Sequence, residues 1–217
     1  SGSTSKYVIF RRVPTSNVYN HSTKIYFLYE WSEFALLQSS LHQEWAFWNS
    51  GTMGASTLRY STSTSLETWP MPGSGALEEL NGFGHRYHEF REDYLLRRNI
   101  GLTDFYNKVH SPANHESDFG VFRVLTQELD REVLKAYGWD DLDLEHGFHE
   151  MEYLPPKDRV RFTISPRARI EVLRPLSALN HERYAAEQAA RPQKSVRRSK
   201  LRAPEFILLS DELIAEE

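Results

Sequence analysis

Residues 99–144 read NIGLTDFYNKVHSPANHESDFGVFRVLTQELDREVLKAYGWDDLDL, and the rest of the chain is organised around this stretch. Its second half carries apolar residues at mostly three- and four-residue steps, which places them on one stripe of an amphipathic helix. The stripe consists of Phe119, Phe122, Val124, Leu125, Leu129, Val133, Leu134 and Tyr137. Ser117 or Asp118 can cap the start of this helix, and Gly138 suits the left-handed turn that ends it. The helix needs a partner surface, so we expect the stripe to lie in the core.

Upstream of this helix the sequence changes character. Residues 6–12 and 22–31 favour strands, because β-branched and aromatic residues dominate both. Residues 34–48 read as a helix with an apolar face. That face consists of Phe34, Leu37, Leu41, Trp45 and Trp48. Residues 53–65 are rich in Ser and Thr, and residues 57–61 can form a strand.

Residues 69–73 read WPMPG, which breaks the chain and predicts a boundary. Residues 75–98 after it form a second amphipathic pattern, which Gly82 and Gly84 can interrupt early. The sequence therefore predicts a second amphipathic helix over residues 75–98.

Downstream of the central helix, residues 145–160 read as a loop and residues 160–164 as a short strand or extended link. Ser165 and Pro166 start a last helix, because proline suits the first turn. Pro175 would kink that helix.

These elements predict an α+β fold with a small mixed N-terminal subdomain followed by a helical C-terminal subdomain. We place the first in residues 1–72 and the second in residues 73–184. Residues 185–217 read as a basic flexible tail with a short apolar end.

Charge is distributed unevenly along the 217 residues, although the net charge is only −4. Residues 64–160 carry 10 Lys/Arg and 19 Asp/Glu, whereas residues 1–63 carry 5 and 3. The net charge argues weakly against a nucleic-acid binder, but its distribution matters more: the middle of the chain is acidic and both ends are basic.

Composition also excludes several classes of protein. The absence of Cys excludes disulfides and thiolate chemistry. The sequence lacks an apolar run of the roughly 20 residues that a membrane helix needs, so we expect no membrane partner and a cytoplasmic location. The chain starts at Ser1 rather than Met, which favours a fragment of a longer protein.

Catalytic motifs are missing from the sequence. It lacks a phosphate-binding Gly-x-x-x-x-Gly-Lys loop. The paired acids Asp140 and Asp141 fit a water-facing cap better than a catalytic dyad, since nothing nearby would raise a pKa.

Two copies of the pattern His-x-x-His-Glu occur, at residues 85–89 and 146–150. Histidines three apart on a helix can share a metal ion, but a third and fourth ligand are not evident. Ordinary hydrogen-bonding histidines are the simpler interpretation, and a metal hydrolase is the least favoured hypothesis.

Side chains suited to DNA recognition gather in the N-terminal part. Arg, Asn and Gln read base edges, and hydroxyls and cations hold phosphates. The candidate contacts are Arg11, Arg12, Lys24, Asn49, Ser50, Ser56, Thr57, Arg59 and Tyr60. A Ser/Thr-rich surface loop without function would have the same composition.

A longer pattern carries a resemblance to a known family. Residues 101–110 fit GLT-x-x-YN-x-x-H, and residues 125–141 fit L-x-x-E-x-D-x-x-V-x-x-AYGW-x-D. Residues 37–45 fit LQS-x-x-H-x-x-W, followed by Arg59-Tyr60-Ser61 and by ETWPMP at residues 67–72. Together these resemble the C-terminal target-recognition region of large type IIG-like and phage-defence N6-adenine DNA methyltransferases. In ETWPMP, Trp69 and Met71 replace two phenylalanines of the family's motif.

The resemblance implies a function that the residues alone do not. The chain would be the DNA sequence-recognition module of an S-adenosylmethionine-dependent enzyme, with double-stranded DNA and that enzyme's catalytic domain as partners. The chain lacks a glycine-rich cofactor loop and the Asn/Asp-Pro-Pro-aromatic motif, so we expect no cofactor in this fragment. The alternative is a non-catalytic protein-interaction module of a defence complex, with the acidic middle as its contact surface.

Overall fold

The computed structural model describes residues 5–190, apart from residues 15, 17, 20–22 and 54–56. The described part is an α+β fold, as the sequence predicts. Its α-helices are α1 (Trp31–Gln38), α2 (Ser40–Asn49), α3 (Leu80–Arg98), α4 (Leu102–Val109), α5 (Ser117–Tyr137) and α6 (Pro166–Ala190). Two antiparallel strand pairs accompany them: β1 (Gly51–Met53) with β2 (Thr57–Arg59), and β3 (Gly147–Glu150) with β4 (Val160–Thr163).

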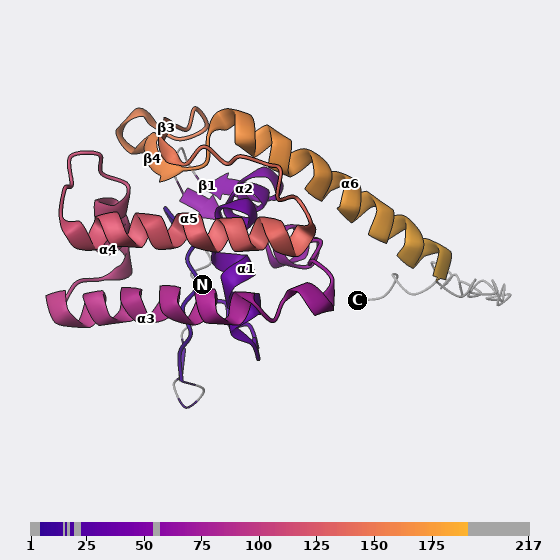
Figure 1. Ribbon diagram of the computed structural model, residues 1–217, viewed down its shortest axis with the longest axis horizontal. Helices are drawn as coiled ribbons and strands as arrows, with labels where there is room; N and C mark the ends of the chain where they lie inside the picture. The colour runs from indigo at the N-terminus through magenta and orange to yellow at the C-terminus, as the bar shows by residue number, and fades with distance from the viewer. Residues whose placement is uncertain (1–4, 15, 17, 20–22, 54–56, 191–217) are drawn as a thin grey trace, which may run out of the picture.

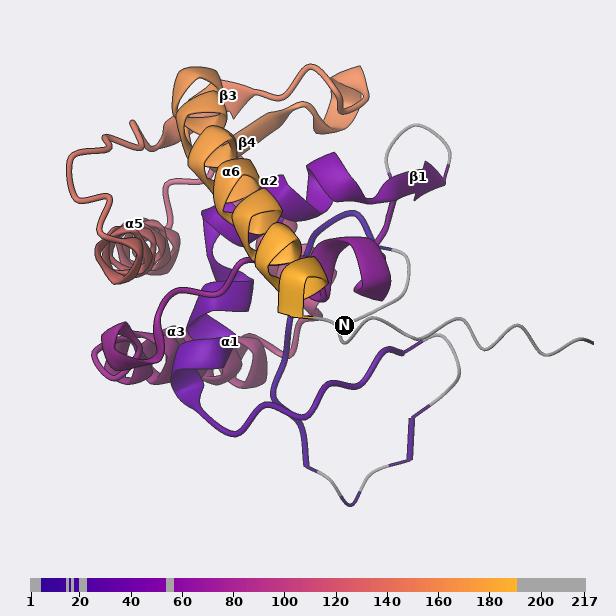
Figure 2. The same cartoon turned by 90° about the vertical axis from the view of Figure 1, so that its right-hand side faces the viewer.

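The helices α3 and α5 run antiparallel, with α4 in the connection between them (Figure 1). Left-handed residues end both long helices: Asn99 has φ 49° after α3, and Gly138 has φ 72° after α5. Figure 2 shows α3 and α5 nearly end-on, with α1 and α2 on one side of them. This pair is therefore the support on which the N-terminal half of the chain packs.

The predicted central helix is confirmed as α5, which begins at Ser117 and ends at Tyr137. Phe119, Phe122, Leu129 and Val133 are all fully buried. Val124 was predicted in the same stripe, yet its side chain is 50% exposed. The prediction for Val124 is wrong because it is two residues from Phe122, which turns it away from the buried face.

The predicted helix over residues 34–48 is two helices, since the chain breaks at Ser39 (φ −64°, ψ 154°). The Ser39 hydroxyl accepts a hydrogen bond from the His42 amide at 3.2 Å and so caps the start of α2. The predicted apolar face is buried on both sides of the break, except that Trp48, in the last turn of α2, is 76% exposed.

The predicted strands at residues 6–12 and 22–31 do not form ladders within the described part of the chain. Ser5 makes an isolated antiparallel bridge to Leu58, and Trp31 already belongs to α1. From Ile25 to Tyr29 exposure still alternates along the chain, as in a strand. The residue types therefore predicted an extended backbone correctly, but propensity does not supply a pairing partner.

The helix predicted from residue 75 begins later, at Leu80, and runs through both glycines. Gly84 is required by packing: a Cβ atom there would lie 2.3 Å from the Trp31 carbonyl oxygen. The strand and helix predicted at residues 160–166 are confirmed as β4 and α6, but the segment before them is not all loop, because it contains β3.

One hydrophobic cluster extends from Tyr7 to Leu176 and includes Trp69, Leu80 and Phe105. The core is thus continuous past residues 72 and 73, where we expected a subdomain boundary. Residues 185–190, which we assigned to a tail, belong to α6. The rest of the expected tail, residues 191–217, lies outside the described residues.

Candidate nucleic-acid interface

The pair β1–β2 presents one of the predicted DNA contacts to solvent. Arg59 lies opposite Gly51 in the register, and its side chain is exposed. Its guanidinium has no hydrogen-bond or ion-pair partner among the described residues. Thr57, two residues earlier on the same strand, is half-buried, and Ser56 lies outside the described residues. Arg59 is therefore available for a partner.

Asn49 and Ser50 stabilise a local turn. The Ser50 hydroxyl is 2.7 Å from that of Ser65 and accepts a hydrogen bond from the Ser61 amide at 3.2 Å. The Asn49 amide group donates to the Trp45 carbonyl at 2.9 Å, and Thr64 donates to the Asn49 carbonyl. The polar side chains of this region thus hydrogen-bond the connection between β2 and residues 62–66. The side chains of Asn49 and Ser50 therefore have partners within the protein.

Tyr60 was predicted to contact DNA, and its burial argues against that role. Its side chain is 3% exposed, and its hydroxyl is 2.9 Å from Nε2 of His42. Burial lowers the pKa of His42 to about 3 and raises the pKa of Tyr60, so both groups stay neutral. Alternation along β2 explains the difference from Arg59, because neighbouring side chains on a strand point to opposite faces. We therefore remove Tyr60 from the contact set.

The three predicted N-terminal cations lie around one cavity. Arg11 pairs with Glu92 through Nε at 3.0 Å, and Lys24 donates to the Tyr60 carbonyl at 2.7 Å. Arg12 stacks on Trp31, with its guanidinium carbon 4.1 Å from the ring centroid. All three cations line a cavity of about 540 Å³. The fold therefore brings together residues that lie up to thirteen positions apart in the sequence.

The cavity itself was not predicted. Its walls are the extended segments around residues 9–14 and 23–28, with Phe34, Leu102 and Thr103 completing them. The sequence signal that could have revealed it is the density of aromatic residues among the cations between Phe10 and Trp31. That signal was read as a β strand, which also favours aromatic residues.

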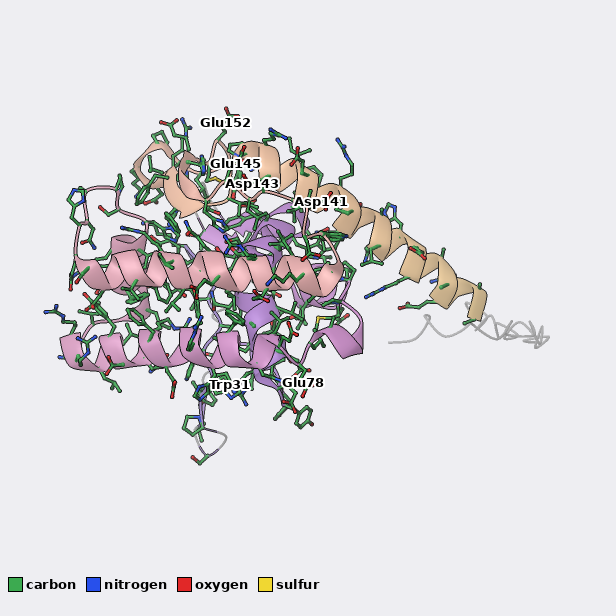
Figure 3. The ribbon with its side chains drawn as sticks, viewed as in Figure 1. Trp31, Glu78, Asp141, Asp143, Glu145 and Glu152 are labelled. Atoms are coloured by element: carbon green, nitrogen blue, oxygen red, sulfur yellow. The ribbon has the colours of Figure 1, made fainter. Side chains whose placement is uncertain are left out.

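Acidic side chains occupy a different face. Asp140, Asp141 and Asp143 are exposed, as the sequence predicts for a water-facing cap. Figure 3 shows Asp141 and Asp143 with Glu145 on the α6 side of the molecule, and Trp31 on the opposite side. Because Arg12 stacks on Trp31, that cation lies away from the acidic face.

The residues that carry the family resemblance form a buried network. Arg91, fully buried, donates to Gln38 at 3.3 Å, to the Tyr106 hydroxyl at 3.1 Å and to the Phe10 carbonyl at 2.8 Å. Asp130 accepts from the Ser40 amide at 2.7 Å and lies 2.7 Å from Nε2 of His146. The two motif blocks thus contact each other, and their polar residues hold the fold together.

The histidines of the two His-x-x-His-Glu patterns form local contacts. His85 pairs with Glu89 at 3.1 Å, and His149 lies 2.8 Å from the Glu145 carbonyl oxygen. Among the described residues, His, Asp and Glu side chains do not gather in groups of three or more that could hold a metal ion. These contacts favour the simpler interpretation of both patterns.

Comparison with family models, with curated proteins and with solved structures gave no match. None of the described helices combines the length and apolar character that crossing a membrane requires. The functional argument therefore depends on the geometry of the site and on the resemblance seen in the sequence.

Proposed function

We propose that this chain is the DNA sequence-recognition module of an S-adenosylmethionine-dependent N6-adenine DNA methyltransferase. The observation that carries the proposal is the exposed, unpaired Arg59 on the two-stranded β1–β2 ribbon. A β ribbon fits the major groove, where an arginine can bind a guanine edge through two hydrogen bonds. Arg12, whose guanidinium has no acceptor among the described residues, would favour the phosphate backbone.

The rest of the described chain would hold this ribbon in place. Ser50 and Ser65 tie the start of β1 to the turn after β2, and Lys24 reaches the backbone of Tyr60. A reading residue needs such support, because a flexible side chain on a flexible loop loses more entropy on binding. Methyl transfer and cofactor binding would belong to the enzyme's catalytic domain, which is the second proposed partner.

A selection experiment tests the proposal with the chain as it stands. The protein would be incubated with a pool of duplexes that share a randomised centre, and the bound fraction sequenced. We expect enrichment of a motif that contains a guanine. Arg59→Ala should lose preference at that position, because a bidentate contact discriminates by about 1–3 kcal/mol.

Arg131→Ala is the matched control, since Arg131 is an exposed arginine on α5 outside the ribbon. It should keep the wild-type motif. Absence of duplex binding at low salt, or an unchanged motif with Arg59→Ala, would contradict the assignment.

The acidic face supports a second candidate, a protein-interaction module. Asp140, Asp141 and Asp143 together form an exposed anionic surface that would repel DNA and attract a basic partner. This candidate predicts that duplex binding is absent at every salt concentration. The same binding experiment therefore separates the two.

A further inference from the structure

The cavity beside Arg12 has the size of a ligand site. Its volume is about 540 Å³, within the range of roughly 300–1,000 Å³ that small-molecule pockets occupy. It lies between residues 9–14 and residues 23–28, and Phe34 and the start of α4 complete its wall.

The described lining combines aromatic rings with cations, and it contains no carboxylate. The aromatic members are Phe10, Tyr19, Tyr26, Phe27 and Phe34, and the cations are Arg11, Arg12 and Lys24. The rings of Phe10 and Tyr26 lie with their centroids 6.1 Å apart and their planes tilted by 53°. Aromatic walls favour a flat ring, and cations without carboxylates favour a negative charge. The complementary ligand has both.

Arg12 is the cation best placed to bind that charge. Arg11 is already paired with Glu92, and Lys24 donates to Tyr60. The Arg12 guanidinium has no hydrogen-bond or ion-pair acceptor among the described residues, and its Nη1 is buried. Stacking on Trp31 fixes the plane of the guanidinium, which prepares its donors for a phosphate. Because Nη1 is closed to solvent, the phosphate would bind the remaining donors of this guanidinium.

The start of α4 adds to the same preference. Leu102 and Thr103 are its first two residues, and both line the cavity. Amide groups in the first turn of a helix lack partners within the helix, so this end carries partial positive charge. The effect is small by itself, but it has the same sign as the charge of Arg12.

We propose that this cavity binds a single unpaired nucleotide, with the base against the aromatic wall and the phosphate at Arg12. This goes beyond the proposed reading of duplex DNA by Arg59, because a base stacked and paired within a duplex cannot leave it to enter a pocket without being unpaired. The nucleotide is either a free nucleoside monophosphate or an unpaired residue of a strand, since both present a base and a phosphate.

Calorimetric titration with three probes tests the chemistry: deoxyadenosine 5′-monophosphate, deoxyadenosine, and inorganic phosphate. We expect the monophosphate to bind about tenfold to a hundredfold more tightly than either part, as charge-assisted hydrogen bonds predict. Equal binding of phosphate and monophosphate would overturn the role of the aromatic wall. Absence of binding by all three probes and by the single strand described below would overturn the proposal.

Substitutions locate the binding. Arg12→Ala should reduce the affinity for the monophosphate to that of the nucleoside, and Arg12→Lys should recover only part of it, because an ammonium lacks the planar fork. Phe27→Ala should weaken both the monophosphate and the nucleoside. Phe27 is 79% exposed, so its removal leaves the fold intact even if Arg12→Ala does not. Unchanged affinities in all three variants would place the ligand elsewhere and overturn the proposal.

Two further experiments identify the source of the nucleotide and test this proposal separately from the proposed recognition of duplex DNA. A short single strand that competes with the monophosphate supports an unpaired residue, whereas failure to compete supports a free nucleotide. Arg59→Ala should leave monophosphate binding unchanged. Nucleotide binding without duplex binding would support the nucleotide site and contradict the reading of DNA by Arg59. Duplex binding without nucleotide binding would contradict the nucleotide site and leave the proposal for Arg59 in place.

Discussion

The helical support and the N-terminal extended segment use the same kinds of residue in opposite ways. In α3 and α5 the aromatic residues pack together, and Arg91 donates three hydrogen bonds in the interior. In residues 5–30, Phe27 is 79% exposed and Tyr29 is 83% exposed, while Arg12 has no acceptor among the described residues. A folded chain tolerates such exposure only where it costs little or where a ligand covers it. The helical part therefore maintains the fold, and the exposed side chains of the N-terminal segment are the ones that the proposed nucleotide site would use.

The largest expected effect tests the first half of this contrast. Leu129 is fully buried in α5, so Leu129→Ala should lower the free energy of unfolding by roughly 2–5 kcal/mol. Val124→Ala, on the same helix but half exposed, should cost less than about 1 kcal/mol. Urea denaturation of both variants measures this, and similar losses would mean that the buried face of α5 has been misassigned.

A pH experiment tests the buried polar groups. Burial raises the pKa of the Glu44 carboxyl from 4.5 to about 7, against the opposing effects of Arg169 and Tyr153. The fold therefore favours the neutral carboxyl, and its stability falls as pH rises from about 4.5 to about 7. Glu44→Gln removes this loss. The free energy of unfolding of the variant minus that of the wild type should therefore be roughly 3 kcal/mol larger at pH 8 than at pH 4.5.

Glu78→Gln provides the control, because Glu78 is exposed on the surface, as Figure 3 shows. Its stability difference from the wild type should not depend on pH. The titration of His42 is common to all three proteins and cancels in the comparison. A pH-independent difference for Glu44→Gln as well would contradict the raised pKa.

Two glycines in α3 test how closely α1 packs against α3. Gly84→Ala places a methyl group against the Trp31 carbonyl and should cost about 1–3 kcal/mol. A Cβ atom at Gly82 meets nothing within 4 Å, so Gly82→Ala should stabilise by about 0.5–1 kcal/mol. Thermal melting of the pair would reveal the opposite signs, and a stabilising Gly84→Ala would show that α1 does not approach α3 closely.

The smallest expected effect concerns the N-terminal segment. Phe27→Ala should change stability by less than about 0.5 kcal/mol, because the ring is mostly in water. Denaturation in urea is sufficient to check this. A loss comparable to that of Leu129→Ala would mean that Phe27 supports the core, and the contrast between the two regions would fail.

Sequence patterns predicted the elements that are determined locally. The spacing of apolar residues identified α5, Gly138 marked its end, and Pro166 marked the start of α6. Ser39 was missed because its side chain caps a helix in the middle of an otherwise continuous apolar pattern. A cap and an interior serine look alike in sequence unless the backbone angle is known.

The candidate site was less predictable, because it depends on contacts between distant residues. Arg59 and Tyr60 are neighbours with similar sequence surroundings, yet one is exposed and the other is bonded to His42. The alternation of Leu58 and Tyr60 with Arg59 indicates that Arg59 lies on the opposite face, but the bond from Tyr60 to His42 of α2 cannot be predicted from the sequence of β2. The stacking of Arg12 on Trp31 likewise spans nineteen positions and follows from the start of α1.

The C-terminal part of α6 sets the distance between the protein core and the end of that helix. Asn180 donates to the Thr68 carbonyl at 2.6 Å, and every residue from 181 to 190 is exposed. At 1.5 Å per residue, this ten-residue segment holds whatever follows Ala190 about 15 Å from that anchor. Insertion of one residue would lengthen the distance from Asn180 to the end of α6 by only about 1.5 Å, but it would rotate the attached group by about 100° around the helix axis. An insertion in this segment therefore changes both the distance from Asn180 and the direction in which the attached group points. Only an insertion close to a whole number of turns, such as seven residues, changes the distance and nearly keeps the direction.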